Sequence, residues 1–243
     1  MTGLLERLGH AGRPPSRPAG LSGLAKRRWW LVPVALAVLL LAGGWLVGLS
    51  SVLGVRTVTV GGEHRVSGAR IIAAARIPHG APLARLDTAA VRARIAAIPA
   101  IRTVSVSTSY PATVRIRVTE RVAVGFRPDP AGAVLVDAAD VPFDTLAQPP
   151  RGLPELPVTD DRARSSAAAT VAAALPADFV GAVERIAVPT TQTITLTLTD
   201  GRTVLWGGTD RSAEKAKLVP VLVHQPGRYF DVSDPSSVIS RGR

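Results

Sequence analysis

The chain has 243 residues and a formal net charge of +11, and its hydrophobic residues include few aromatic ones. This length permits one large or two small domains, with a core built mainly from Ala, Val, Leu and Ile. Because there is no cysteine, disulfides and thiolate-bound metals are excluded. The bias toward Ala, Arg, Gly and Pro is typical of a GC-rich genome.

The positive charge is unevenly distributed along the chain. Residues 1–28 have a net charge of +5, residues 29–126 a net charge of +8, and residues 127–243 a net charge of −2. Binding to a polyanion would therefore concern the first half of the chain.

Residues 29–49 form an uninterrupted apolar run, WWLVPVALAVLLLAGGWLVGL. At 1.5 Å per residue this run spans about 31 Å as a helix, which matches a hydrocarbon core of about 30 Å. Lys26, Arg27 and Arg28 precede it, and two tryptophans open it. The positive-inside rule then predicts that residues 1–28 are cytoplasmic and that the chain after about residue 50 is extracytoplasmic.

A cleaved signal peptide is the alternative interpretation of this run. Its apolar part would be shorter, about 7–15 residues, and a small-x-small cleavage site would follow. Ser50, Ser51 and Val52 form a poor site of that kind, so the pattern favours an uncleaved anchor. Gly44 and Gly48 form a GxxxG pair that could pack two membrane helices together, although glycine is common in such helices in any case. The basic, Pro/Gly-rich residues 1–28 are expected to be disordered.

After the anchor, the sequence predicts strands and helices in the order β-α-α-β-β. A strand at 55–62 is followed by a helix capped by Ser67, with Ile71, Ile72 and Ala75 on one face. A second helix starts near Asp87 and carries Val91, Ile95 and Ile98 inward, with Arg92 and Arg94 outward; strands at 101–109 and from 113 complete the unit. Two helices covering one face of a three-stranded sheet is a stable two-layer α+β arrangement.

The last of these strands separates apolar from cationic side chains. In SYPATVRIRVTERVAVGF, Val114, Ile116 and Val118 alternate with Arg115 and Arg117. We expect the apolar side chains to cover the helices and the arginines to lie on the open face of the sheet. Anionic headgroups, an acidic protein partner or only solvent could face them there.

The combination of a single anchor and this unit resembles the FtsQ/DivIB family of bacterial cell-division proteins, in a GC-rich genome of actinobacterial type. The segments VRTVTVGG and GAPLARLDTAAVRARIAAIPAIRTVSVSTSYPATVRIRVTER carry the resemblance. Ser109 before Tyr-Pro and VAVGF after Glu120-Arg121 depart from the family pattern. The resemblance implies that this unit is a POTRA domain, a fold that also occurs in outer-membrane assembly proteins.

The remainder of the chain resembles the second extracytoplasmic domain of the same family. AVLVDAADVPFD predicts a strand pair with Asp140 where glycine is usual, and SSAAATVAAAL a helix capped at Ser165 or Ser166. TTQTITLTLTDGRTVLWGG predicts a hairpin, DRSAEKAKLVPVLVHQ a helix carrying Lys215 and Lys217, and RYFDVSDPSSVIS a short strand with a proline turn.

The predicted fold class is therefore α+β: a transmembrane helix, a POTRA domain, and a mixed α/β second domain with a C-terminal edge strand. The predicted division of the chain is a cytoplasmic tail, an anchor, a POTRA domain, an FtsQ-type β domain and a C-terminal tail, at residues 1–28, 29–49, 50–126, 127–235 and 236–243.

No pattern in the sequence predicts a catalytic, cofactor or metal site. The four histidines have no metal-ligand spacing, and neither a Gly-x-Ser-x-Gly elbow nor a phosphate-binding glycine loop occurs. Asp160-Asp161 falls in a predicted loop and is typical of a solvated turn. A cell-wall hydrolase or a nucleic-acid-binding protein would lack its expected residues here.

The family resemblance implies a non-enzymatic scaffold of the divisome at the division septum. Its implied partners are coiled-coil proteins of the FtsB/FtsL type and the septal peptidoglycan synthase complex, with no nucleic acid and no small-molecule substrate or cofactor. A partner segment could add a strand at the edge near the C-terminus. The candidate residues for this contact are Lys217, Tyr229, Phe230, Asp231, Val232 and Ser233. Core packing is an equal alternative for Tyr229, Phe230 and Val232, and a POTRA-type chaperone or export component is the alternative function.

Overall fold

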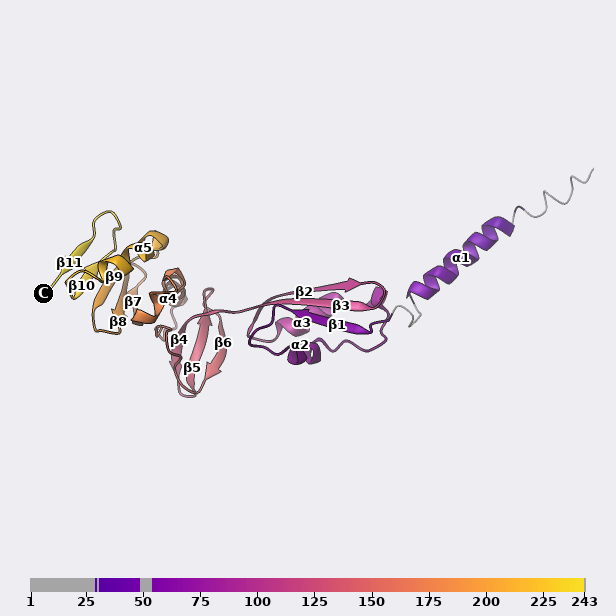
Figure 1. The fold of residues 1–243 in the computed structure, drawn as a ribbon, viewed down its shortest axis with the longest axis horizontal. Helices are drawn as coiled ribbons and strands as arrows, with labels where there is room; N and C mark the ends of the chain where they lie inside the picture. Colours follow the sequence, from indigo (N-terminus) through magenta and orange to yellow (C-terminus); the bar gives the residue numbers. More distant parts are fainter. Residues whose placement is uncertain (1–28, 30, 49–53, 243) are drawn as a thin grey trace, which may run out of the picture.

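The computed structural model describes residues 29, 31–48 and 54–242. Its elements follow one another from the helix α1 to the two sheet-containing units (Figure 1). The expected cytoplasmic tail at 1–28 and the three residues weighed as a cleavage site at 50–52 lie outside the described residues.

The helix α1 covers Leu31–Gly48 and includes both Gly44 and Gly48. Among the residues that the structure describes, no helix meets the length and apolarity that a membrane crossing requires. The anchor at 29–49 and the packing role of the two glycines stay predictions.

The first unit has the predicted β-α-α-β-β order. It comprises β1 (Thr57–Gly61), α2 (Gly68–Ala75), the short 3-10 helix η3 (Leu83–Arg85), α3 (Thr88–Ala96), β2 (Ile101–Ser109) and β3 (Thr113–Glu120). The sheet order is β1-β3-β2, with β1 parallel and β2 antiparallel to β3. Both helices lie against one face of this sheet (Figure 1).

Local sequence signals explain where these helices begin. The hydroxyl of Ser67 accepts from the N–H of Arg70, so this predicted cap is confirmed. The carboxylate of Asp87, near which the second helix was expected to start, accepts from the N–H of Ala90 and caps α3. Ile71, Ala75, Val91, Ile95 and Ile98 are buried as expected.

Two side chains on these helices differ from the expectation. Ile72 is 43% exposed, because it lies one residue past the buried face of a helix only eight residues long. Arg94 was expected to point outward but is half-buried, and its Nε donates to the carbonyl oxygen of Ala75 at 3.0 Å.

The two faces of β3 are divided as predicted. Val114, Ile116 and Val118 are buried in the core, whereas Arg115 and Arg117 are exposed. The nearest cross-strand neighbours of the two arginines are uncharged: Thr59 and Ser107 beside Arg115, and Gly61 and Ser105 beside Arg117.

The second unit begins with a three-stranded meander and continues into a five-stranded sheet. The meander is β4 (Ala123–Asp129), β5 (Gly132–Asp137) and β6 (Pro142–Leu146). The larger sheet has the order β11-β10-β9-β8-β7 and is covered by α4 (Arg162–Ala174) and α5 (Ser212–Leu222). The predicted limit between residues 126 and 127 falls inside β4, and the division into domains stays a prediction.

The strands of the larger sheet are β7 (Val183–Thr190), preceded by η4 (Val180–Ala182), β8 (Thr193–Leu198), β9 (Thr203–Gly207), β10 (Tyr229–Asp231) and β11 (Ile239–Arg241). The predicted 194–206 hairpin is β8 and β9. Glu155 bridges the two sheets of this unit, because its backbone pairs with Phe126 on β4 and with Arg185 on β7. The outer side of β7 is thereby covered.

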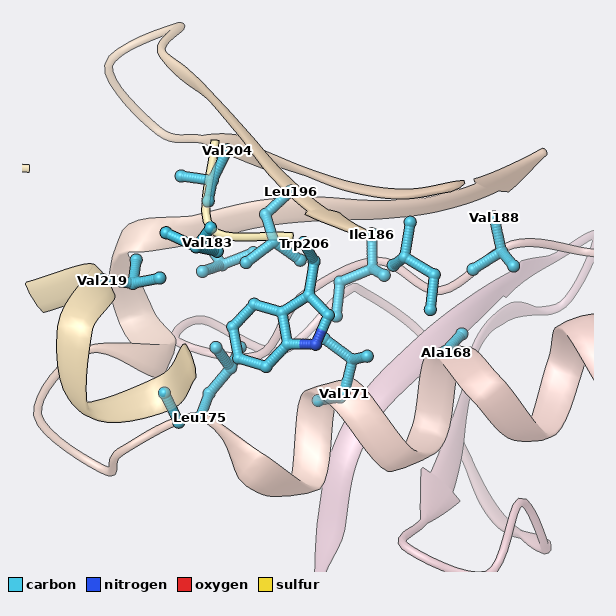
Figure 2. Packing of buried hydrophobic residues seen from close by; sticks show 14 of the residues in the cluster. Ala168, Val171, Leu175, Val183, Ile186, Val188, Leu196, Val204, Trp206 and Val219 are labelled. Carbon is cyan, nitrogen blue, oxygen red and sulfur yellow. The ribbon is translucent and has the colours of Figure 1, made fainter. Parts of the chain in front are cut away.

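Trp206 on β9 is the centre of the second core. It is fully buried between the sheet and the helices, beside Val171 of α4 and Leu175 directly after this helix (Figure 2). Its indole N–H donates to the hydroxyl of Ser212 at 3.2 Å, so its polar atom also has a partner.

The helix α4 starts earlier than the sequence suggested. Asp161, and not Ser165 or Ser166, is its cap, since its carboxylate accepts from the N–H groups of Ala163 and Arg164. Ser165 is instead buried within α4, where its hydroxyl accepts from Arg127 and donates to Asp140. The cap was missed because the alanine run hides a first turn that contains two arginines.

Two ion pairs cross the junction between the first unit and the meander. Arg121 Nη1 lies 2.6 Å from Asp137 Oδ2, and both side chains are largely buried. Arg65 Nη2 lies 3.0 Å from Asp144 Oδ2, and both side chains are much more exposed. Asp137 also closes its own turn, because its Oδ1 accepts from the N–H groups of Ala139 and Val141.

Hydrogen bonds shift the pKa values of two carboxylates at this junction. Desolvation alone would raise the pKa of Asp137, but the N–H of Val141, the guanidinium of Arg121 and the N–H of Ala139 outweigh it and lower the pKa. Desolvation is likewise the largest single effect on Glu120, yet three backbone N–H donors at 64–66 together lower its pKa. Both groups are therefore stabilised in their charged forms.

Candidate partner-binding surface

The strand β10, which holds most of the candidate residues, is not the edge of its sheet. It pairs in parallel with β9 on one side and antiparallel with β11 on the other. The chain turns back after Asp234 and adds one more strand within the residues expected to be a tail. The edge of this sheet is therefore β11, not the strand at Tyr229–Asp231.

The candidate residues of β10 divide by the alternation of the strand. Phe230 and Val232 are fully buried and belong to the core around Trp206. Tyr229 and Asp231 are half-buried and point to the opposite, open face, while Ser233 is exposed after the strand. For Phe230 and Val232, core packing is thus the arrangement observed.

Asp231 and Ser233 interact with each other. Asp231 Oδ1 accepts from the backbone N–H of Ser233 at 3.0 Å and from its hydroxyl at 2.6 Å. Gly207, with φ of +76°, lies against Ser233, and a Cβ at Gly207 would come within 2.7 Å of the Ser233 Cβ. Ser233 is therefore held by both the strand before it and the last residue of β9.

Lys217 lies on the other side of the sheet from Tyr229 and Asp231. It is exposed on α5, whose Ala216 and Val219 pack into the same core as Phe230. Because Phe230 and its neighbours Tyr229 and Asp231 point to opposite faces, the sheet separates Lys217 from the open-face candidates. The structure brings Tyr229 and Asp231 together but not Lys217.

The two lysines of α5 have different environments. Lys215 is fully buried, and its Nζ donates to the carbonyl oxygen of Gly208 at 3.0 Å, with Asp210 Oδ1 at 3.7 Å. A buried lysine is tolerated where it has hydrogen-bond and charge partners of this kind. Of this pair, only Lys217 is available to a partner.

A cationic side chain connects α5 to the loop that follows β10. Arg211 Nη2 lies 2.8 Å from Glu214 Oε2, and Arg211 Nη1 lies 3.4 Å from Asp234 Oδ1. The pKa of Asp234 is lowered, first by the backbone N–H of Ser236 and also by Arg211. This loop is therefore fixed between α5 and the edge of the sheet.

The residue that the sequence analysis missed on this surface is Ile239. Its backbone pairs with Asp231, so its side chain lies on the same open face as Tyr229 and Asp231, and it is 39% exposed. The signal was the apolar pair Val238-Ile239 after the proline turn, which divides into one half-buried and one exposed residue. The open-face candidates are Tyr229, Asp231 and Ile239.

Across residues 29, 31–48 and 54–242, no three His, Asp or Glu side chains gather in a way that could hold a metal ion.

Comparisons with known proteins match both units of the chain. The family model described as "POTRA domain, FtsQ-type" matches residues 53–121, and "Cell division protein FtsQ/DivIB, C-terminal" matches residues 128–234. The second match separates the chain from POTRA proteins of the export type, which the sequence had left as an alternative.

Curated relatives described as "Cell division protein FtsQ" extend this similarity. The one from Streptomyces collinus is 37% identical and covers 96% of this chain and 94% of its own length. Those from Mycobacteroides abscessus and Mycolicibacterium smegmatis are 37% and 39% identical over 84% and 88% of this chain. The chain spans only about two thirds of these two mycobacterial proteins, 67% and 64% of their lengths.

A solved extracytoplasmic domain of DivIB from Geobacillus stearothermophilus is 18% identical, with a TM-score of 0.35 over 43% of this chain and 92% of that one, too low to support an argument. The two family models and the full-length similarity to the Streptomyces relative are sufficient: the chain belongs to the FtsQ/DivIB family of bacterial cell-division proteins, with an FtsQ-type POTRA domain.

Proposed function

We propose that this protein is a non-enzymatic scaffold of the divisome that links coiled-coil proteins of the FtsB/FtsL type and helps control septal peptidoglycan synthesis during cell division. Its membership of a cell-division family carries the proposal. A protein-binding role also agrees with the described residues, which offer an open sheet face and a strand edge.

The proposed topology is a single-pass protein of the cell membrane at the septum. Residues 1–28 would be cytoplasmic, 29–49 the anchor, 50–126 the POTRA domain, 127–235 the FtsQ-type domain and 236–243 a C-terminal segment. Support comes from the apolar run and from the arginines and lysine that precede it. Gly44 and Gly48 would allow close packing of the anchor against another membrane helix.

The proposed contact with a coiled-coil partner is strand addition at β11. The far side of β11 carries no further strand among the described residues, so its backbone groups can accept an extended segment. Tyr229, Asp231 and Ile239 on the adjoining open face would then select the partner through side-chain contacts. Phe230 and Val232 support this surface from the core side, and Ser233 lies at its periphery. Lys217 lies on the opposite face of the sheet and is not part of this contact.

Co-purification of the full chain with an FtsB/FtsL-type partner tests this surface. Ile239→Lys places a charge on the open face and should weaken binding by about tenfold, the loss typical of a disrupted apolar contact. Val221→Lys is the matched control, because Val221 is 66% exposed on α5, which covers the opposite face. Equal binding by both variants would remove β11 and its open face as the site.

A cell-based test addresses the role itself. Depletion of the protein should give filamentous or branched cells without septa, and a fluorescent fusion should gather at midcell. Loss of surface proteins with normal septation would contradict the proposal.

A further inference from the structure

Three segments of the first unit meet at the end where the chain enters it from α1. The backbone N–H of Arg56 donates to Ala112 in the β2–β3 turn at 2.9 Å, and the N–H of Val55 donates to Ala81 at 2.9 Å. Gly54 also bridges Pro82. The entering chain, the loop before η3 and the tip of the β2–β3 hairpin therefore form one surface.

This surface lies close to the end of α1, whatever the path of the chain between them. Only five residues, 49–53, separate Gly48 from Gly54. Six residue steps span at most about 20 Å of extended chain. If α1 lies in the membrane, this end of the unit cannot be far from the headgroups.

The exposed side chains at this end include cationic and aromatic ones. We call the set the proximal end: Arg56, His79, Arg85, Tyr110 and Arg115, all exposed. Tyr110 at the hairpin tip is 57% exposed. Among the described residues, none of these three arginines forms an ion pair within 4.0 Å.

The carboxylate nearest in sequence to these groups is already engaged. Asp87 follows Arg85 by two residues, and its Oδ1 accepts from the N–H of Ala90 as the cap of α3. The opposite end of the unit is different, since Glu120 there binds the N–H groups at 64–66 and Arg65 and Arg121 pair with acids. Among the described residues, the three arginines of the proximal end are therefore all without an ion pair, whereas the opposite end combines the paired Arg65 and Arg121 with exposed Arg70 and Arg102.

We propose that the proximal end binds the phosphate-bearing headgroups of anionic lipids beside the anchor, which sets the tilt of the first unit on the membrane. Arginine binds phosphate through paired N–H donors, and tyrosine is favoured at the membrane–water interface. The arginines of the proximal end are spread around the exposed ring of Tyr110. This spacing fits a surface of many headgroups better than it fits a single extended peptide. This inference rests on the proposed anchor.

The full chain reconstituted in liposomes provides the test. Because the native chain has no cysteine, Ser107→Cys gives a single labelling site near the tip, on the exposed face of β2. A fluorophore there is quenched by headgroup-labelled lipid when the tip approaches the surface. Vesicles of phosphatidylcholine alone are compared with vesicles containing about one third phosphatidylglycerol, where each nearby arginine contributes about a fivefold bias toward the membrane.

We expect stronger quenching in the anionic vesicles and its loss in Arg56→Gln/Arg115→Gln. The matched control is Arg70→Gln/Arg102→Gln, which removes the same charge from exposed positions toward the opposite end and should quench like the parent. A fluorophore at Ala213→Cys on α5 should be quenched equally in the two kinds of vesicle. The proposal would be overturned if quenching did not depend on lipid charge, or if both double variants lost it equally. An acidic protein would then be the remaining candidate partner of the proximal end.

A flotation assay distinguishes a wrong anchor from a wrong assignment of the proximal end. Chain that no longer floats with vesicles after alkaline carbonate extraction would contradict the anchor and with it the proposal. Chain that floats but shows composition-independent quenching would contradict the proximal end alone.

Discussion

The two units of this protein use their charges in opposite ways. In residues 54–121, eleven arginines accompany three acids, and the only ion pairs that these arginines form among the described residues reach across to the meander. In the second unit, six of the basic residues pair with acids of the same unit: Arg127, Arg164, Arg185, Arg202, Arg211 and Lys215.

The paired charges of the second unit stabilise the fold, whereas the unpaired charges of the first unit are free to contact other molecules. Arg127, Asp140 and Ser165 connect β4, the β5–β6 turn and α4 in one network. Within residues 29, 31–48 and 54–242, Arg115 and Arg117 have no such partner, and their neighbours across the sheet are Thr, Ser and Gly. The first unit therefore depends on its apolar core and caps for stability, and its cationic surface is available for contacts outside the chain.

The largest expected effect concerns a feature that the two units share, the buried apolar core. Trp206→Ala removes a fully buried indole between the sheet and α4 (Figure 2) and leaves a cavity. We expect a loss of about 3–5 kcal/mol in the free energy of unfolding. Chemical denaturation measures it, with Val221→Ala at an exposed position of α5 as the control; a loss below about 1 kcal/mol would contradict the core as described.

The next effect concerns the junction where the charges of the two units meet. Asp137→Ala removes the largely buried partner of Arg121 and the oxygen that accepts two N–H groups of its own turn, and we expect a loss of about 2–4 kcal/mol in the free energy of unfolding. Asp144→Ala breaks the exposed pair with Arg65 and should cost no more than about 1 kcal/mol.

A double-mutant cycle isolates the pair itself. Asp137→Ala and Arg121→Ala, alone and combined, should be coupled by about 1–3 kcal/mol, because the double variant leaves no buried charge unpaired. Additive effects would mean that Asp137 acts only within its turn and that the junction is not held by this ion pair.

The alternation of single strands was readable from the sequence, but the pairing of strands was not. Val114 to Val118 and Ile194 to Leu198 show a two-residue period that places them correctly on the buried face. The position of β10 inside its sheet depends on a strand of three residues that follows a turn, which is too short for any periodic signal. The edge residue Ile239 was missed for this reason.

Ion pairs between residues far apart in the chain could also not be predicted from the sequence. Asp140 stood where glycine is usual and does adopt a positive φ of 62°, so the turn itself was recognisable. Its partner Arg127 and the junction pair of Arg121 with Asp137 join separate elements, and only the folded arrangement brings them together. The same holds for Lys215, whose burial beneath the loop at 208–210 no local pattern indicates.

The pH dependence of stability should follow the two carboxylates near the junction. The pKa values of Glu120 and Asp137 are lowered in the folded chain from ordinary values of 4.5 and 3.8. Their unfolded forms therefore bind protons first, and the stabilisation present above pH 4.5 is lost as the pH falls through the folded-state values.

Glu120→Gln/Asp137→Asn should show this directly. We expect it to be about 1–2 kcal/mol less stable than the parent at neutral pH, with a shallower decline on acidification from about pH 5 to pH 3. Thermal unfolding across this range measures both quantities. Asp129→Asn, an exposed carboxylate on the neighbouring β4, is the control and should keep the slope of the parent. Parallel slopes in the parent and the double variant would show that other groups determine the acid response.

The smallest effect should fall on the charges that most distinguish the first unit. Arg115→Gln/Arg117→Gln removes two exposed guanidiniums that have no charged neighbour across the sheet, and we expect a change within about 0.5 kcal/mol. Arg127→Gln, which breaks the buried network with Asp140 and Ser165, should by contrast cost about 2–4 kcal/mol by the same denaturation measurement. If the double variant were as destabilised as Arg127→Gln, the arginines of β3 would contribute to the stability of the fold. Their positive charge would then be explained without a partner outside the chain. A near-zero change in stability, together with weaker binding to anionic vesicles, would instead show that the arginines on the open face of the first unit act in a contact outside the chain.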